Sequence, residues 1–265
     1  MARLKIHAVA PGYALTAAFV LRSHAYGESD RIVSFITEDF GKVSGIAKGA
    51  MRSRRRFVNT LEPFVKIRLA FRMRPTSDLA FIERCDLIEI LRGFGNDLDR
   101  FACGSYVLEL VDQLVMGREP GTEIFRLVET TLSTLDSIGY RPSVVRAFEL
   151  HVLEAIGYRP DLTRCRVCGR RVSTLPSVLI VPGSGGIVCL GCRPATGATH
   201  ALTGQTLAML ADLQRHPISA AASWGNDQAA AAAEAALEGL IANVINRPLR
   251  SPAVLSALRQ PASAC

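Results

Sequence analysis

The chain has 265 residues, of which 49% are hydrophobic and 21% charged, so it is long enough and apolar enough to bury a sizeable core. This composition excludes an intrinsically disordered chain. No uncharged apolar run reaches the roughly 18 residues that a membrane span needs, and no apolar segment follows Met1 as it would in a signal peptide. We therefore expect a cytoplasmic protein.

The net charge of +7 is concentrated in the N-terminal part. Residues 1–77 contain 14 Lys or Arg against 5 Asp or Glu, whereas the remaining residues contain 17 against 19. A basic segment joined to a near-neutral one favours a surface that meets a polyanion over a solvated face that only aids solubility. The charge pattern therefore predicts nucleic-acid binding by the N-terminal part.

Short strands are the first predicted elements. Segments rich in Val, Ile, Phe and Thr are separated by turn residues such as Gly27 and Asp30. From Val65 to Arg72, apolar side chains alternate with mostly charged ones, the period of two that a half-buried strand shows. Five strands are expected, at residues 16–23, 31–37, 42–48, 63–72 and 78–90. Five short strands in succession fit a small barrel, of which the OB-fold is one.

After Gly95 the apolar residues recur every three or four positions, which is the period of a helix. Three helical segments are expected before residue 160, and two more at 203–215 and 227–246. Residues 163–200 break this pattern with Cys, Gly and Pro. We thus predict an α+β multidomain chain, divided into an OB-fold domain (1–80), a helical domain in two parts (81–160 and 201–252), a four-cysteine zinc module (161–200) and a tail (253–265).

Four of the seven cysteines form two CxxC pairs, Cys165 with Cys168 and Cys189 with Cys192, twenty residues apart. Each pair places two thiolates on one tight turn, and two pairs make the tetrahedral four-sulfur set that zinc prefers. Four thiolates close the coordination shell, so we expect one structural rather than catalytic zinc ion. The alternatives are two disulfides, which need an oxidising compartment, or a redox pair, which normally lies in a thioredoxin-like pattern. Cys85 and Cys103 fall in apolar patterns and are interpreted as inert core residues.

A basic stretch without acids runs between Asp39 and Glu62, and a second lies between Glu62 and Asp78. Arg suits a phosphate track because its guanidinium bonds phosphate oxygens bidentately and stacks on bases. The residues predicted to bind nucleic acid are Lys42, Lys48, Arg52, Arg54, Arg55, Arg56, Lys66, Arg68, Arg72 and Arg74. Phe57, Phe40 and Tyr26 lie nearby as stacking candidates, although core packing is the favoured interpretation for each.

Catalysis has little support in the sequence. The five histidines are scattered, and no GxSxG, HExxH or Walker motif is present. With no paired carboxylates and a closed metal shell, no catalytic residue is assigned. We predict that the chain is not an enzyme.

These features together resemble the RecO family of bacterial recombination mediators. The first two strands, residues 18–22 and 26–33, are similar to the start of the family pattern, and residues 35–37, 40–42, 47–50, 55–57 and 61–64 continue it. Residues 157–160, with Leu162 and the first CxxC pair, match the entry to the family's zinc module, and residues 247–251 resemble its C-terminal signature. Each motif alone is weak, but the ordered series over about residues 15–252 is specific.

The resemblance implies a DNA repair protein, associated with the nucleoid, that binds single- and double-stranded DNA and anneals complementary strands. It implies work with RecR to load RecA onto DNA coated by single-stranded DNA-binding protein. Some members of the family lack the zinc cysteines, whereas this chain keeps all four.

An annealing protein that works on coated DNA must also recognise the coating protein. We expect residues 95–160 with 200–250 to bind its acidic C-terminal tail in a groove with a basic rim. The candidate rim residues are Arg118, Arg126, Arg141 and Arg146. Two other classes stay open: a zinc-ribbon OB-fold protein that binds RNA or acts in translation, and a purely structural adaptor with weak, non-specific DNA affinity.

Overall fold

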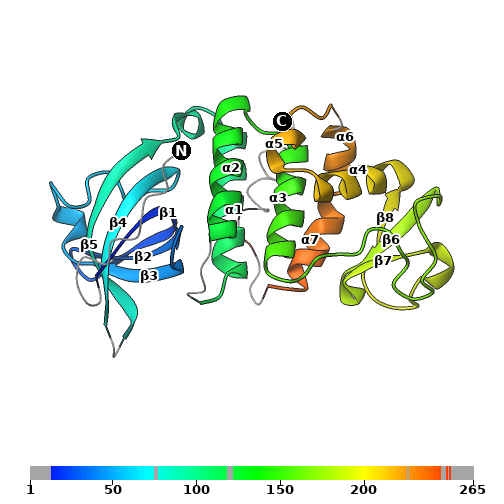
Figure 1. Cartoon of the computed structure of the whole chain (residues 1–265), viewed down its shortest axis with the longest axis horizontal. Helices are drawn as coiled ribbons and strands as arrows, with labels where there is room; N and C mark the ends of the chain where they lie inside the picture. Colours follow the sequence, from blue (N-terminus) through cyan, green and yellow to red (C-terminus); the bar gives the residue numbers. More distant parts are fainter. Residues whose placement is uncertain are drawn as a thin grey trace, which may run out of the picture. The chain divides into compact units, whose positions relative to one another are not determined.

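The computed structural model of the chain describes residues 13–74, 77–117, 122–225, 227–245, 249 and 251 (Figure 1). Contacts divide the chain into two compact units, Met1–Leu132 and Ser133–Cys265. Within the described ranges, no helix combines the length and the apolar character needed to cross a membrane.

Unit 1 is built on a closed barrel of five strands, which confirms the predicted OB-like fold. The strands follow the order β1-β2-β3-β5-β4, and all pairs are antiparallel except β3 with β5. Strand β5 pairs with β4 as far as Ile90, in agreement with the last strand expected at residues 78–90. The strands are β1 (Tyr13–Tyr26), β2 (Asp30–Thr37), β3 (Gly41–Ala47), β4 (Val65–Arg74) and β5 (Ser77–Ile90).

The barrel closes where β3 meets β5, with Gly45 opposite Ala80. A Cβ atom on Gly45 would lie 2.8 Å from the Ala80 carbonyl oxygen and closer still to the Ile82 side chain. Only glycine therefore allows the two backbones to approach this closely. The absence of a side chain at this position is a condition for closing the barrel.

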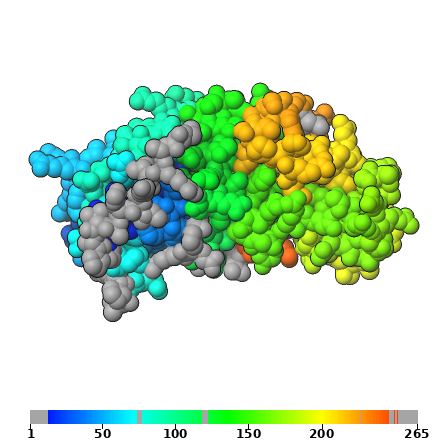
Figure 2. Space-filling view, viewed as in Figure 1, coloured from blue at the N-terminus to red at the C-terminus, as the bar shows by residue number. Residues whose placement is uncertain are grey.

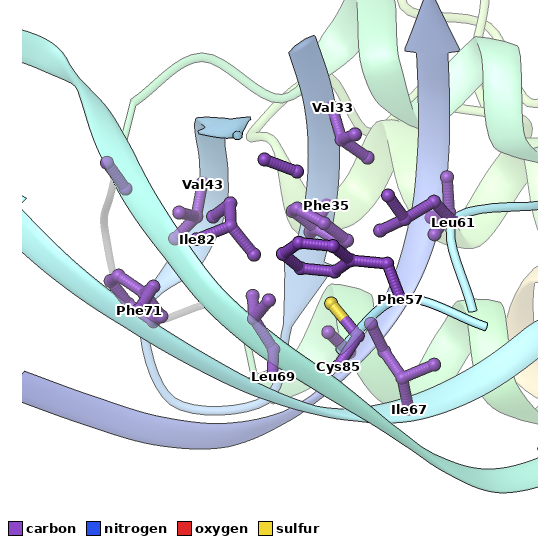
Figure 3. Close-up of a cluster of buried hydrophobic side chains, with 14 of the residues drawn as sticks. Val33, Phe35, Val43, Phe57, Leu61, Ile67, Leu69, Phe71, Ile82 and Cys85 are labelled. Carbon is purple, nitrogen blue, oxygen red and sulfur yellow. The ribbon is translucent and has the colours of Figure 1, made fainter. Parts of the chain in front are cut away.

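The interior of the barrel is filled by the inward half of each strand and by one loop. Val65, Ile67, Leu69 and Phe71 are all at most 5% exposed, as the alternation along β4 predicts. The loop between β3 and β4 (residues 48–64, hereafter the basic loop) contains the one-turn helix η1 (Ala50–Arg52) and adds Phe57 and Leu61 to the core. Figure 3 shows both side chains among those of the strands.

Two helices follow the barrel and pack beside β1, and the second continues from unit 1 into unit 2. After the short helix η2 (Arg92–Gly95), α1 (Leu98–Leu114) is capped by Asp97, whose carboxylate accepts a hydrogen bond from the Arg100 backbone N–H at 3.0 Å. The helix α2 (Thr122–Ile138) buries Phe125 against Phe19 of β1, with ring centroids 5.6 Å apart. Both helices therefore cover part of the outer surface of the barrel.

Unit 2 is built around α3 (Pro142–Ala155), which α4, α5, α6 and α7 contact. The predicted helix at 227–246 is two shorter helices, and α5 was not foreseen. The surrounding helices are α4 (Gly204–Arg215), α5 (Ile218–Ala221), α6 (Asp227–Ala232) and α7 (Glu234–Ala242). A small antiparallel sheet in the order β7-β6-β8 is formed by β6 (Ser177–Val181), β7 (Gly186–Val188) and β8 (His200–Thr203), with short helices η3 (Pro182–Ser184) and η4 (Leu190–Cys192).

Candidate metal centre and nucleic-acid interface

The four cysteines of the two CxxC pairs come together in unit 2, with all Sγ atoms within 4.8 Å of one another. Each pair lies on a tight turn: the Gly169 N–H donates to the Cys165 carbonyl, and the Cys192 N–H donates to the Cys189 carbonyl, both at 2.9 Å. Gly169 has a φ of +71°, a backbone conformation that favours glycine. The residue types and the turns at both pairs therefore build one cluster from segments twenty residues apart.

The spacing of the sulfur atoms fits a zinc ion. A tetrahedral ion with Zn–S bonds of about 2.3 Å requires S···S separations of about 3.8 Å. The Sγ atoms of Cys168 and Cys189 are 3.8 Å apart. The cluster is thus able to hold a metal ion, and its all-thiolate donor set is the one that a structural zinc prefers.

The pKa values of the cluster's thiols are also consistent with cation binding. Burial opposes the ionisation of Cys165, but the backbone N–H groups of Cys168, Cys189 and Val167 outweigh it and lower the pKa of the thiol to about 6. Hydrogen bonding to Cys189 and then Cys168 raises the pKa of Cys192 to about 12. Four neighbouring thiols cannot all ionise without a positive charge among them, and a divalent cation supplies that charge.

The remaining cysteines that the structure describes are core residues. Cys85 and Cys103 are both buried, at 3% and 0% exposure. Burial, and then the charge of Asp86, raises the pKa of the Cys85 thiol to about 12, so the thiol stays protonated and unreactive at neutral pH. Cys265 lies outside the described residues.

Three of the cations predicted to bind nucleic acid are engaged in ion pairs within unit 1. The Nζ atom of Lys42 lies 2.9 Å from a carboxylate oxygen of Asp112 on α1, and its side chain is only 18% exposed. Lys66 pairs with Glu129 on α2, and Arg72 pairs with Glu83 on β5. These three side chains have acidic partners, so less of their charge is offered to a ligand than the sequence suggested.

The basic loop presents the other cations at the surface. Lys48, Arg52, Arg54 and Arg55 are exposed, and among the described residues they have no acidic partner. Arg56 is exposed but tethered, because its guanidinium donates to the Lys48 carbonyl at 2.7 Å and lies 5.0 Å from the centre of the Phe57 ring. The loop is therefore an ordered support rather than a flexible tether.

Phe57 and Leu61 anchor the basic loop in the barrel core, and the Cys85 N–H of β5 donates to the Arg56 carbonyl at 3.0 Å. Arg68 is exposed on β4, directly opposite Asp86 of β5. The side chain of Arg74 lies outside the described residues.

The aromatic stacking candidates and the candidate rim residues differ in burial. Phe57 is 5% exposed in the core, and Phe40 packs edge-on against Phe71 with ring centroids 5.5 Å apart, as core packing predicts, whereas Tyr26 is exposed. Of the rim candidates, Arg126 is exposed on α2, Arg141 pairs with Asp227 at 3.1 Å, and Arg118 lies outside the described residues.

Arg146 does not lie at the surface. It is 4% exposed, and its guanidinium lies 2.7 Å from the carboxylate of Glu149, which is fully buried. Sequence reasoning placed Arg146 on a rim because charged residues are rarely buried unless they are paired. The pairing partner lies three residues later on the same helix, which is the spacing that could have revealed it.

Sequence reasoning also missed the acids that organise unit 1. Asp112, 7% exposed, receives both Lys42 and Arg22, the latter at 3.3 Å. It lies on the buried face of α1, where an apolar residue is the usual choice. An acid at a core-facing helix position was the available signal that this helix packs on a basic strand face.

A closed OB-like barrel with exposed cations on one loop, followed by a helical part with a four-thiol cluster, defines an α+β multidomain protein. Two protein-family models match this chain. "Recombination protein O N terminal" matches residues 13–91, and "Recombination protein O C terminal" matches residues 95–253. The chain belongs to the RecO family.

Relatives described as "DNA repair protein RecO" agree with this membership. The protein of Anaeromyxobacter sp. strain K is 43% identical over 207 residues, which cover 77% of this chain and 80% of the relative. That of Syntrophus aciditrophicus is 31% identical over 250 residues, covering 92% and 96%. That of Geobacter metallireducens is 35% identical over 240 residues, covering 91% and 96%. These matches support a DNA repair protein and do not favour the translation-associated alternative.

Proposed function

We propose that this RecO-family chain is a non-enzymatic recombination mediator. It binds single- and double-stranded DNA, anneals complementary strands and, with RecR, helps to load RecA onto DNA coated by single-stranded DNA-binding protein, acting at the nucleoid in the cytoplasm. The single observation that carries the proposal is a basic loop anchored on an OB-like barrel in a chain of this family.

The proposed DNA track runs over the exposed cations of unit 1. Lys48, Arg52, Arg54 and Arg55 lie on the basic loop, which its apolar side chains hold in place, so a phosphate backbone meets charges that are already positioned. Preorganised arginines lose less conformational entropy on binding than arginines on a flexible chain. Phosphate contacts carry no sequence information, so we propose binding without base preference.

In the proposed metal centre, Cys165, Cys168, Cys189 and Cys192 hold one structural zinc ion. The ion ties the two turns together, and with four protein ligands it has no open position for water or substrate. We assign it no catalytic part. With the ion bound, the two turns are held in fixed positions, and the zinc module can present its surface residues to partners.

Strand annealing on coated DNA tests the proposed function. Two complementary strands are first coated with the cognate single-stranded DNA-binding protein, and duplex formation is followed by a fluorescent dye pair. We expect annealing that depends on this protein and that is stimulated over the coated strands alone. A chain that leaves the coated strands single would contradict the proposal, and tighter binding to structured RNA than to single-stranded DNA would favour an RNA-binding function.

Arg54→Ala together with Arg55→Ala should weaken DNA binding without loss of stability. Each phosphate neutralised on a single strand contributes about −0.7 to the slope of log affinity against log salt, so the slope should become flatter by about 1.4. By the same rule the affinity at about 0.1 M salt should fall about 25-fold, equally for all sequences. Arg56 is left in place, because it bonds the Lys48 carbonyl and packs on Phe57.

The matched control removes the same charge from cations that already have acidic partners. Arg72→Ala with Arg84→Ala releases Glu83 and Asp86 and should change the salt slope much less. Fluorescence anisotropy over a salt series measures the slope, and thermal melting checks the fold. An unchanged slope in the loop variant would mean that the basic loop is only a solvated surface.

We also propose that the helical part binds the acidic tail of the single-stranded DNA-binding protein. Arg126 and Arg141 are the rim candidates that remain at the described surface. Calorimetry with the tail peptide at low salt should show binding that weakens on replacing both arginines by alanine. If the intact tail peptide gives no heat of binding, this proposal is contradicted. If the double variant binds the tail with unchanged affinity, the tail-binding site lies away from these two arginines.

A further inference from the structure

The near-neutral charge of residues beyond 77 hides a second basic segment. Residues 162–211 contain five arginines and no Asp or Glu, whereas residues 78–160 contain 8 Lys or Arg against 14 Asp or Glu. All five arginines are exposed in the structure: Arg164, Arg166, Arg170, Arg171 and Arg193. All five lie within the proposed zinc module (residues 161–200) of unit 2, which is at the surface in the space-filling view (yellow-green in Figure 2).

Two of these arginines lie against each other. Arg164 and Arg171 form an antiparallel β-bridge, in which directly opposite side chains lie on the same side. Both line a cavity of about 480 Å³, together with Arg215 of α4 and with the Thr163 and Ser173 side chains. Like charges placed directly opposite each other are destabilising, so the fold alone gives no reason to keep this pair.

Neither of the nearby acids forms an ion pair with Arg164 or Arg171. Asp161, the acid of the module, accepts hydrogen bonds from Thr163 and interacts electrostatically with Arg166. Asp212 also lines the cavity, but it pairs with Arg215. Among the described residues, Arg164 and Arg171 have no ion-pair partner. The cavity thus carries two uncompensated positive charges.

The thiolate cluster does not account for the pair either. Arg170 lines the same hollow as Cys168, Cys189 and Cys192, so it is placed to offset the charge of a zinc-thiolate centre. The cavity of Arg164 and Arg171 contains none of the four cysteines among its lining residues. These two arginines therefore present their charge to something outside the chain.

We propose that the zinc module carries a second DNA-binding surface, centred on Arg164 and Arg171, that holds a strand separate from the one bound by the barrel; this rests on the proposed function. The two guanidinium groups bond one phosphate group, as arginine forks do. Other exposed arginines of the module, Arg166 and Arg193 among them, extend the positive field. A field spread in this way suits a long polyanion better than the end of one acidic peptide, which needs a single basic site.

Holding two strands on one chain assists annealing by raising their effective concentration for each other. A chain with one surface must exchange strands, whereas a chain with two keeps both until they pair. Simultaneous binding of a second strand therefore distinguishes a chain with two DNA-binding surfaces from a chain with one.

Simultaneous capture is measured with two short single strands of non-complementary sequence, one with a donor dye and the other with an acceptor dye. The full-length, zinc-loaded wild type should give energy transfer between them. Arg164→Ala with Arg171→Ala should retain the first strand and bind the second about 25-fold more weakly at about 0.1 M salt, with a slope flatter by about 1.4, because two phosphate charges are no longer neutralised. The control, Arg84→Ala with Arg159→Ala, removes the same charge from arginines that pair with Asp86 and Glu154, and it should keep wild-type capture.

A second variant separates binding from folding. Arg171→Glu places an opposite charge beside Arg164, so it should raise or preserve the melting temperature and retain zinc while second-strand capture is lost. A lower melting temperature in Arg171→Glu would instead show that the pair has a structural role and would overturn the inference. Wild-type capture in both variants would overturn it as well.

The remaining outcomes distinguish the inference from the function it rests on. A wild type that binds no single strand at all contradicts the proposed function. A wild type that binds and anneals, but whose capture of two strands is unaffected by the zinc-module variants, contradicts only the second surface. If the variants lose the acidic tail peptide and keep both strands, the surface is a peptide site and the inference is wrong.

Discussion

Replacing Cys165 by serine should reduce the zinc content from one ion per chain to none and unfold the zinc module. The Sγ atoms of the four cysteines lie within 4.8 Å of one another, so three remaining thiolates leave the ion an open position and a weaker hold. Metal binding and folding are linked, and structural zinc contributes about 10–16 kcal/mol in small peptides. We expect rapid proteolysis within residues 161–200 and lower solubility, with the barrel of unit 1 intact.

Elemental analysis of protein prepared without chelator, combined with limited proteolysis, makes this measurement. Cys103→Ala is the matched control, because it removes a cysteine that lies outside the cluster and should keep one zinc per chain. Wild-type protein without metal would contradict the zinc assignment. Zinc together with hydrolytic activity would contradict the closed shell, and a folded zinc-site variant that loses first-strand binding would contradict the proposed role of the barrel.

Arg146→Ala should lower the free energy of unfolding of unit 2 by about 3–5 kcal/mol, the cost of removing one partner of a buried ion pair. The carboxylate of Glu149 is fully buried, and the variant takes away the guanidinium 2.7 Å from it. Replacing both residues by leucine should recover part of this loss, because neither charge of this ion pair is then left in the interior without the other.

Urea denaturation measures the effect, with Arg141→Ala as the control. Arg141 pairs with Asp227 at the surface, and an exposed pair contributes at most about 1 kcal/mol. Suppose that Arg146→Ala lowers the free energy of unfolding no more than the control does and also weakens tail binding. Arg146 would then be a surface residue, and the prediction of a buried Arg146–Glu149 ion pair would be wrong.

The barrel was predictable because it follows from local pattern. Residues 65–72 alternate in the sequence, and in the structure Val65, Ile67, Leu69 and Phe71 are buried while Arg68 and Arg72 are exposed. The cysteine cluster was predictable for the same reason, since CxxC spacing is a property of a single turn. The small sheet of unit 2 was not predicted, because its three short strands are separated by turns and are paired only by the fold.

The sequence by itself determined the family, the five strands and the four clustered cysteines of this protein, since each depends on residue type and spacing within short segments. Only the tertiary structure decided which charges remain available. Lys42 and Lys66 meet acids 70 and 63 residues away along the chain. Arg164 and Arg171 are brought opposite each other without an acid between them. Electrostatic energy depends on distance in space and on burial, and neither is a property of the sequence before it folds.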